Sequence, residues 1–312
     1  MNQSLYHSSR NKGYFALFLT SFLWGTTWVV SKFTLQSLPG LQLSYLRQFI
    51  AGGCFLLYFI GFKKQPLPTL KDFKSLLIMS ILMFVFANAL STWGLKYLPT
   101  GLAALIGALY PIIVVGIEWV FYKKKDVNKL TIIGLFIGIL GVFFVFNENM
   151  GNQIDADTLF GLALSFFAIF CWSLGTVFLS KHHLSINPYY GMGWKMMIGS
   201  LILFVCTNLT TQVVPLQEIN FNTWMSLFYL IIIGSIISFI AFIYSLKVLP
   251  AAVASLYAYA NPIVATITAG IVLDEKITLN ILLGTAITIL GVYIVNHSIK
   301  RDVEEIVIES EI

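Results

Sequence analysis

Charged side chains are scarce in this sequence, and their scarcity excludes an ordinary soluble domain. Only 11% of the 312 residues are charged, whereas a soluble domain usually carries about 25%. Apolar residues make up 58%, which leaves too little polar area to cover a water-exposed surface. A lipid bilayer removes that requirement because its hydrocarbon solvates an apolar exterior. The composition therefore indicates an integral membrane protein with the lipid bilayer as its partner.

Residues for metal and cofactor chemistry are also few. Cys54, Cys171 and Cys206 lie inside apolar runs without the spacing of a metal site. The adjacent pair His182-His183 has no further ligands nearby, and the sequence contains no Walker A phosphate-binding loop. We therefore expect no metal, no cofactor, no ATP-driven step and no enzyme activity. A membrane-embedded enzyme remains the alternative, and covalent turnover of a substrate by the purified protein would reveal it.

A nucleic-acid partner is not expected, although the formal net charge is +5. The basic residues form short clusters between apolar runs, and a nucleic-acid-binding domain would carry them as a stripe or patch on one face. The sequence indicates no oligomeric state.

Long apolar runs dominate the chain and predict an all-helical polytopic membrane protein. About 20 residues are needed to cross about 30 Å of hydrocarbon, and backbone groups in lipid must bond within the segment, as they do in a helix. Ten runs meet this length approximately. They cover residues 14–35, 41–62, 74–95, 100–121, 130–147, 159–180, 189–209, 224–246, 251–273 and 278–297.

Lysine and arginine gather in the connecting segments on one side of the predicted membrane. Lys63, Lys71 and Lys300 lie on the same side as the N-terminus, whereas the opposite segments hold only a few, such as Lys96 and Lys276. Cytoplasmic loops carry the excess of positive charge. We therefore predict a multi-pass protein of a bacterial inner membrane with both termini in the cytoplasm.

The chain contains an internal repeat. Leu95-Lys96-Tyr97-Leu98-Pro99 recurs as Leu246-Lys247-Val248-Leu249-Pro250, and Pro111 recurs as Pro262, each 151 residues later. Each copy holds five predicted helices, and because five is odd the second copy has the opposite topology. Inverted repeats are the basis of alternating access in secondary transporters. We predict a cytoplasmic N-terminus (1–13), two five-helix repeats (14–147 and 159–297), an outer linker (148–158) and an acidic cytoplasmic tail (298–312).

These motifs resemble the drug/metabolite transporter superfamily, in particular its EamA-type ten-helix members. The resemblance rests on motifs spread over residues 14–297, which are Trp24-Gly25, Arg47, Leu98-Pro99-Thr100, Pro111, Gly134, Gly138, Gly141, Leu249-Pro250-Ala251, Asn261-Pro262, Gly284 and Gly291. It implies a pseudosymmetric bundle around a central cavity and transport of amino acids or related metabolites, often outward. Eukaryotic relatives carry nucleotide sugars and triose phosphates, which is a second alternative. Where the family often has Gly-Glu, this chain has Leu273-Asp274-Glu275.

Ionisable groups inside predicted spans are candidates for function because a charge in hydrocarbon is costly. Arg47 lies about two turns into the second span, and Lys195 occupies the corresponding place in the seventh. Lys32 and Glu118 lie nearer to helix ends, where a long side chain can reach the interface. A contact with a substrate carboxylate and a structural ion pair are both open for Arg47.

Aromatic and amide side chains near mid-depth complete the predicted substrate-binding set. The set consists of Trp24, Arg47, Asn88, Tyr110, Trp172, Tyr257, Tyr259 and Asn261. Packing between helices is the competing interpretation for the amides and the tryptophans. We expect a secondary transporter, an exporter of a small-molecule substrate such as an amino acid. A passive structural or receptor subunit is a further class that a transport assay would separate.

Overall fold

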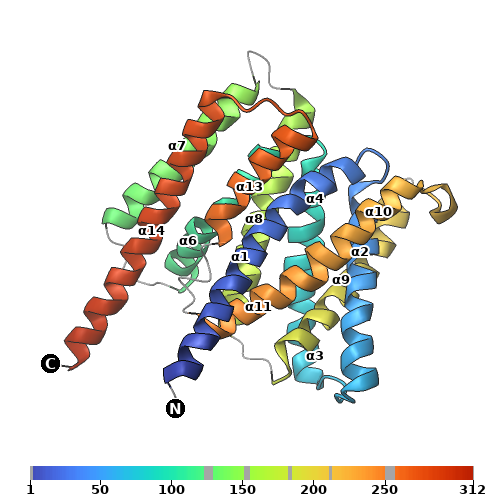
Figure 1. Cartoon of the computed structure of the whole chain (residues 1–312), viewed down its shortest axis with the longest axis horizontal. Helices are drawn as coiled ribbons and strands as arrows, with labels where there is room; N and C mark the ends of the chain where they lie inside the picture. The colour runs from blue at the N-terminus through green and yellow to red at the C-terminus, as the bar shows by residue number, and fades with distance from the viewer. Residues whose placement is uncertain are drawn as a thin grey trace.

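The computed structural model describes residues 3–122, 129–150, 155–181, 185–210, 213–249 and 257–311. Within these ranges the regular secondary structure is entirely helical (Figure 1). The elements of the first half are α1 (Gln3–Thr34), α2 (Gly40–Leu56), η1 (Leu57–Phe62), α3 (Leu70–Ser80), η2 (Ile81–Ala89), α4 (Leu90–Leu95), α5 (Thr100–Ala108), α6 (Tyr110–Tyr122) and α7 (Lys129–Met150). Those of the second half are α8 (Ala156–Lys181), α9 (Pro188–Thr210), η3 (Leu216–Glu218), α10 (Phe221–Tyr229), η4 (Leu230–Ile237), α11 (Ser238–Val248), α13 (Tyr257–Val272) and α14 (Leu279–Glu311).

The predicted all-helical membrane fold is confirmed. In the described ranges, eight helical runs are long and apolar enough to cross a bilayer, and Tyr257–Val272 and Leu279–Val295 are two shorter apolar helices. Together they follow the ten predicted spans in order. The first six residues of the predicted ninth span, residues 151–154 of the predicted linker and the His182-His183 pair lie outside the described residues.

Helical backbone also extends beyond the predicted spans. Helix α1 begins at Gln3, inside the predicted N-terminal segment, and α14 continues through the predicted acidic tail to Glu311. The fourth span is interrupted, since α5 ends at Ala108 and α6 starts at Tyr110. Pro111 has no backbone N–H to donate, which explains the break at this point.

The two ends of the bundle are distinct. Both chain termini lie at one end (Figure 1), together with Pro66 and Pro188, and we call this the terminal end. The opposite end, which carries Leu38 and Pro99, is the distal end. Helix α1 starts at the terminal end. Helix α8 starts at the distal end, where the Phe160 ring packs against Tyr97 with centroids 5.5 Å apart. The second half therefore has the inverted topology.

Equivalent contacts at the two ends match the inverted repeat. At the distal end Gln42 accepts a hydrogen bond from the Val214 amide at 2.9 Å and donates to the Val214 carbonyl at 2.7 Å. At the terminal end the Tyr190 hydroxyl donates to the Pro66 carbonyl at 3.2 Å. Gln42 and Tyr190 are 148 residues apart, and so are Pro66 and Val214. In each repeat, a residue of the second helix thus hydrogen-bonds the loop that follows the second helix of the other repeat.

The third and eighth spans each contain a π-helical stretch, η2 and η4, at corresponding positions of the two repeats. A π-helix bonds residue i to i+5 and often marks a functional site. The serine hydroxyls of η4 and its flank follow the same register, because Ser235 donates to the Leu230 carbonyl at 3.1 Å and Ser238 to the Ile233 carbonyl at 2.6 Å.

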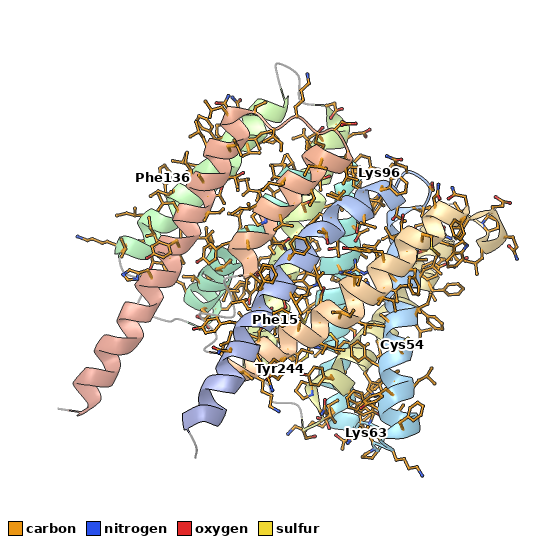
Figure 2. All side chains as sticks on the ribbon, in the orientation of Figure 1. Phe15, Cys54, Lys63, Lys96, Phe136 and Tyr244 are labelled. Atoms are coloured by element: carbon orange, nitrogen blue, oxygen red, sulfur yellow. The ribbon has the colours of Figure 1, made fainter. Side chains whose placement is uncertain are left out.

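The outer surface is apolar, as lipid requires. Phe15 and Phe136 are 62% and 64% exposed, and Figure 2 shows Phe136 at the outer edge of the bundle. Lys63 and Lys96 lie at opposite ends in the same view (Figure 2). A soluble protein would rarely expose so many large apolar side chains, so the surface agrees with the membrane assignment.

Candidate functional site

A cavity of about 180 Å³ lies between the helices of the two repeats, from the middle of the bundle toward the distal end. Its wall comes from α1, α2, η2, α4, α5, α8, α11 and α13. Of the eight predicted substrate-binding residues, six line it: Trp24, Arg47, Asn88, Trp172, Tyr257 and Asn261. Residues from seven predicted spans therefore meet in one place.

Aromatic rings close the cavity on the side of the terminal end. Trp24 packs against Phe239, Phe242 and Tyr257 with ring centroids 5.1 to 5.2 Å apart, and Phe242 also contacts Tyr257 at 5.3 Å. Edge-to-face pairs of this kind add stability beyond the area they bury. We call these four side chains the aromatic floor. It joins α1 of the first repeat to α11 and α13 of the second.

Arg47 lies in the cavity wall and is fixed by the π-helical segment of the eighth span. Its Nε donates to Ser235 Oγ at 2.6 Å, and its Nη2 donates to the Gly234 carbonyl at 3.3 Å. The same carbonyl accepts the Trp24 indole N–H at 3.2 Å. A Cβ on Gly234 would meet Thr27 Cγ2 at 2.7 Å and Arg47 Nη2 at 3.3 Å. Glycine at 234 therefore lets the guanidinium and the indole reach this carbonyl.

The two amides of the wall are each held by one hydrogen bond. Asn88 Oδ1 accepts from Gln48 Nε2 at 3.1 Å, and Asn261 Oδ1 accepts from Trp28 Nε1 at 3.2 Å. Each bond occupies the amide oxygen and orients the group. The Asn261 bond depends on close packing of α1 against α13, since a Cβ on Gly25 would meet Val264 Cβ at 2.5 Å.

Arg47 is the only charged residue among the described residues that line the cavity. Indole, amide and hydroxyl groups supply the remaining polar surface, and Ser165 Oγ is buried there without a hydrogen-bond partner in the described structure. A guanidinium pairs well with a carboxylate because its planar fork offers two parallel donors. The site is therefore suited to a small ligand with one anionic group.

Two predicted binding residues do not line this cavity. The Tyr259 hydroxyl donates to the Val292 carbonyl at 2.9 Å, which ties α13 to α14. The Tyr110 side chain lies beside Thr176 of α8, and the Tyr110 carbonyl accepts a hydrogen bond from Ser173 Oγ at 3.5 Å. Among the other charged candidates, Glu118 is half-buried on α6 and Lys195 is buried on α9.

Several lining residues were absent from the predicted set. Trp28, Ser165 and the α4 pair Ser91 and Thr92 all contribute. Trp28 follows Trp24 by four residues and so shares its helix face, which is a signal that the sequence does contain. Ser91 and Thr92 follow Asn88 by one turn in the same way.

Lys32 connects α1 to the loop after α4 at the distal end of the bundle. Its Nζ donates to the Leu95, Lys96 and Leu98 carbonyls at 2.8, 3.1 and 2.7 Å, where a helix end leaves them unpaired. Nearby, the Glu275 carboxylate accepts from the Thr100 amide at 3.0 Å and from Thr100 Oγ1 at 2.6 Å. Lys32 and Glu275 thus cap the two ends of the loop before α5.

We expect Glu275→Ala to destabilise the protein by about 1.5–3 kcal/mol, because α5 loses a charged acceptor at its first amide. Thermal unfolding of the purified protein in detergent measures the change. Glu218→Ala, at an exposed position of η3, is the matched control and should leave the transition within error. An unchanged transition in Glu275→Ala would show that the cap contributes nothing.

The comparisons with a family model and with known proteins all match transporters. The model of the EamA-like transporter family matches residues 11–147 and 159–297, one match for each repeat. The chain is 28% identical over 282 residues to the uncharacterized transporter YoaV of Bacillus subtilis, covering 90% of this chain and 95% of YoaV. It is 25% identical over 253 residues to the uncharacterized inner membrane transporter YedA of Escherichia coli K12, covering 81% of this chain and 80% of YedA.

A solved crystal structure shares the fold. It aligns with a TM-score of 0.63 over 92% of this chain and 96% of the other, at 16% sequence identity. At this identity the likeness concerns the arrangement of helices alone.

Proposed function

Because the chain belongs to the EamA-like transporter family, we propose that it is a secondary transporter that exports amino acids or related small metabolites. The proposed mechanism is alternating access, in which the two inverted repeats exchange conformations around the cavity. The observation that carries the proposal is the cavity, which lies between both repeats. Its described wall contains one guanidinium, two amides and several indoles.

The chemistry of the wall favours an amino acid or a similar carboxylate. The Arg47 fork offers a site for a carboxylate, while Ser165 and the amides of Asn88 and Asn261 offer neutral groups for the rest of the molecule. Phosphorylated metabolites and nucleotide sugars carry two or more negative charges, and the described wall supplies one cation. The volume of about 180 Å³ also fits a small solute better than a nucleotide sugar.

We further propose that the terminal end faces the cytoplasm of a bacterium. The excess of lysine and arginine near this end supports the orientation, and the relative YedA is named an inner membrane transporter. The cavity described above would then face outward. Export as the direction of flux rests on the family resemblance.

A counterflow assay tests the proposal. Purified protein is reconstituted into proteoliposomes loaded with one unlabelled amino acid at a time, and uptake of the same labelled amino acid is followed. We expect at least one member of the panel to accumulate transiently above its equilibrium level, and empty liposomes to show no accumulation. Failure of every amino acid and related carboxylate in the panel would contradict the substrate class.

A further inference from the structure

Lys195 is a buried charge that the distal cavity does not use. Its side chain is 3% exposed and lies on α9, about two turns from Pro188 and hence in the terminal half of the bundle. Within the described ranges, no hydrogen bond or ion pair joins its ammonium to another residue. An unpaired ammonium inside a membrane protein is costly and is therefore a candidate for function.

The repeat explains both the place of Lys195 and its lack of a partner among the described residues. Lys195 follows Arg47 by 148 residues, the same interval that separates Trp24 from Trp172. Arg47 is held by Ser235 Oγ at 2.6 Å. The residue equivalent to Ser235 lies 151 positions earlier and is Phe84, which has no hydroxyl to accept the bond.

A second pair of equivalent residues points to the same region. Asn261 lines the distal cavity and accepts the Trp28 indole N–H at 3.2 Å. The residue equivalent to Asn261 is Tyr110, and the residue equivalent to Trp28 is Thr176. The Tyr110 side chain lies beside Thr176. The contact between α6 and α8 therefore repeats, with other residue types, the contact between α1 and α13 that shapes the cavity wall.

The structure assigns Lys195 and Tyr110 to a second ligand-binding surface, exposed when the bundle opens at the terminal end, where Lys195 takes over from Arg47 the anionic group of the ligand. Inverted repeats support two conformations in which each repeat takes the shape of the other. In the conformation described here the first-repeat cation, Arg47, faces the cavity and the second-repeat cation is buried. In the opposite conformation the roles are exchanged. The inference rests on the proposed transport function.

The aromatic floor is the barrier that must part for this surface to form. Phe239 and Phe242 lie 151 residues after Asn88 and Ser91, which line the distal cavity. Opening at the terminal end therefore separates Phe239 and Phe242 from Trp24 and exposes the space in front of Lys195. Weakening the floor should shift the population toward that conformation.

Cysteine labelling tests the exposure without any knowledge of the substrate. Lys195→Cys and Arg47→Cys are made in a background that lacks Cys54, Cys171 and Cys206, and anionic sulfonatoethyl methanethiosulfonate is applied to one face of membrane vesicles at a time. We expect Cys at 195 to react only from the face that carries the termini, and Cys at 47 only from the other face. Met196→Cys is the matched control, because Met196 is 1% exposed and packs against Gly52 of α2; it should react from neither face.

Adding Phe242→Ala should move the two reactivities in opposite directions. We expect labelling at 195 to rise several-fold and labelling at 47 to fall, because the floor loses ring contacts with Trp24 and Tyr257. Labelling at 195 from the distal face, or no labelling at 195 with or without Phe242→Ala, would overturn the inference.

The anion role needs a separate readout. Tyr110→Cys serves as the reporter, and its reaction rate with the anionic reagent is divided by its rate with cationic trimethylammonium-ethyl methanethiosulfonate. We expect this ratio to fall roughly fivefold on Lys195→Met and to be restored by Lys195→Arg, since the charge raises the local anion concentration. An unchanged ratio would overturn the anion role. In a separate variant without the Tyr110 reporter, continued labelling of Arg47→Cys beside Lys195→Met verifies the fold. These rates require no transport, so a failed counterflow panel and a failed inference remain distinguishable.

Discussion

We expect Arg47→Met to lower counterflow of the transported amino acid by about 30-fold or more, the largest functional effect of any single change considered. Arg47 is the one charged residue in the described cavity wall. Removing one partner of a buried, hydrogen-bonded charge pair usually costs about 2–5 kcal/mol, and each 1.4 kcal/mol is about tenfold in affinity. Initial rates in proteoliposomes at a substrate concentration below KM measure the effect.

Two further variants define what the Arg47 result means. Lys96→Met removes a positive charge from the surface of the distal end, outside the cavity, and should keep counterflow near that of the unmodified protein. Arg47→Lys keeps the charge and loses the planar fork, so we expect an intermediate rate. The fold should survive in Arg47→Met, because the Gly234 carbonyl still accepts the Trp24 indole N–H at 3.2 Å. Full activity in this variant would exclude Arg47 as the anion contact.

The architecture was accessible from the sequence because lipid imposes a simple length requirement. Apolar runs of about 20 residues identify spans regardless of their neighbours, and the recurrence of Leu-Lys-x-Leu-Pro at residues 95–99 and 246–250 identified the repeat. The order of the ten spans followed from these two signals. The break at Leu109, before Pro111, also has a local cause that a sequence displays.

Features that depend on packing between distant helices were not accessible. The π-helical segments η2 and η4 have no sequence signature as clear as a proline. The role of the Gly234 carbonyl depends on three spans that meet, since Arg47 and Trp24 both donate to it. Nothing in the local sequence around Gly234 indicates that its carbonyl will accept these bonds.

The predicted binding residues also divide into those with a clear sequence signal and those whose place depends on helix packing. Residues with a marked equivalent in the other repeat, such as Trp24 and Arg47, were selected and do line the cavity. Trp28 lies outside the predicted set, and because its equivalent is Thr176, a comparison of the two halves does not draw attention to it. Tyr110 belongs to the predicted set because it lies near the middle of its span. Its depth in the membrane does not indicate whether it lies on the cavity side of the aromatic floor or on the other side. Substrate contact by any of these residues stays a prediction.

Helices α7 and α14 lie side by side at the edge of the bundle (Figure 1). Their close approach depends on glycine. A Cβ on Gly291 would meet the backbone N and Cα of Gly138 and lie 2.7 Å from the Gly134 carbonyl oxygen. Backbone atoms cannot move aside as a flexible side chain can, so the helices must separate or shift.

We therefore expect Gly291→Ala to destabilise the protein by about 3 kcal/mol, at the upper end of typical overpacking costs, and to lower the midpoint of thermal unfolding in detergent by about 6 °C or more. Gly116→Ala is the matched control, because nothing lies within 4 Å of a Cβ built at that position of α6. There the substitution should stabilise by roughly 0.5–1 kcal/mol, since alanine favours the helix over glycine. Opposite signs for one added methyl group would locate the requirement in the contact between the two helices, and equal effects would show that α7 and α14 tolerate a wider separation.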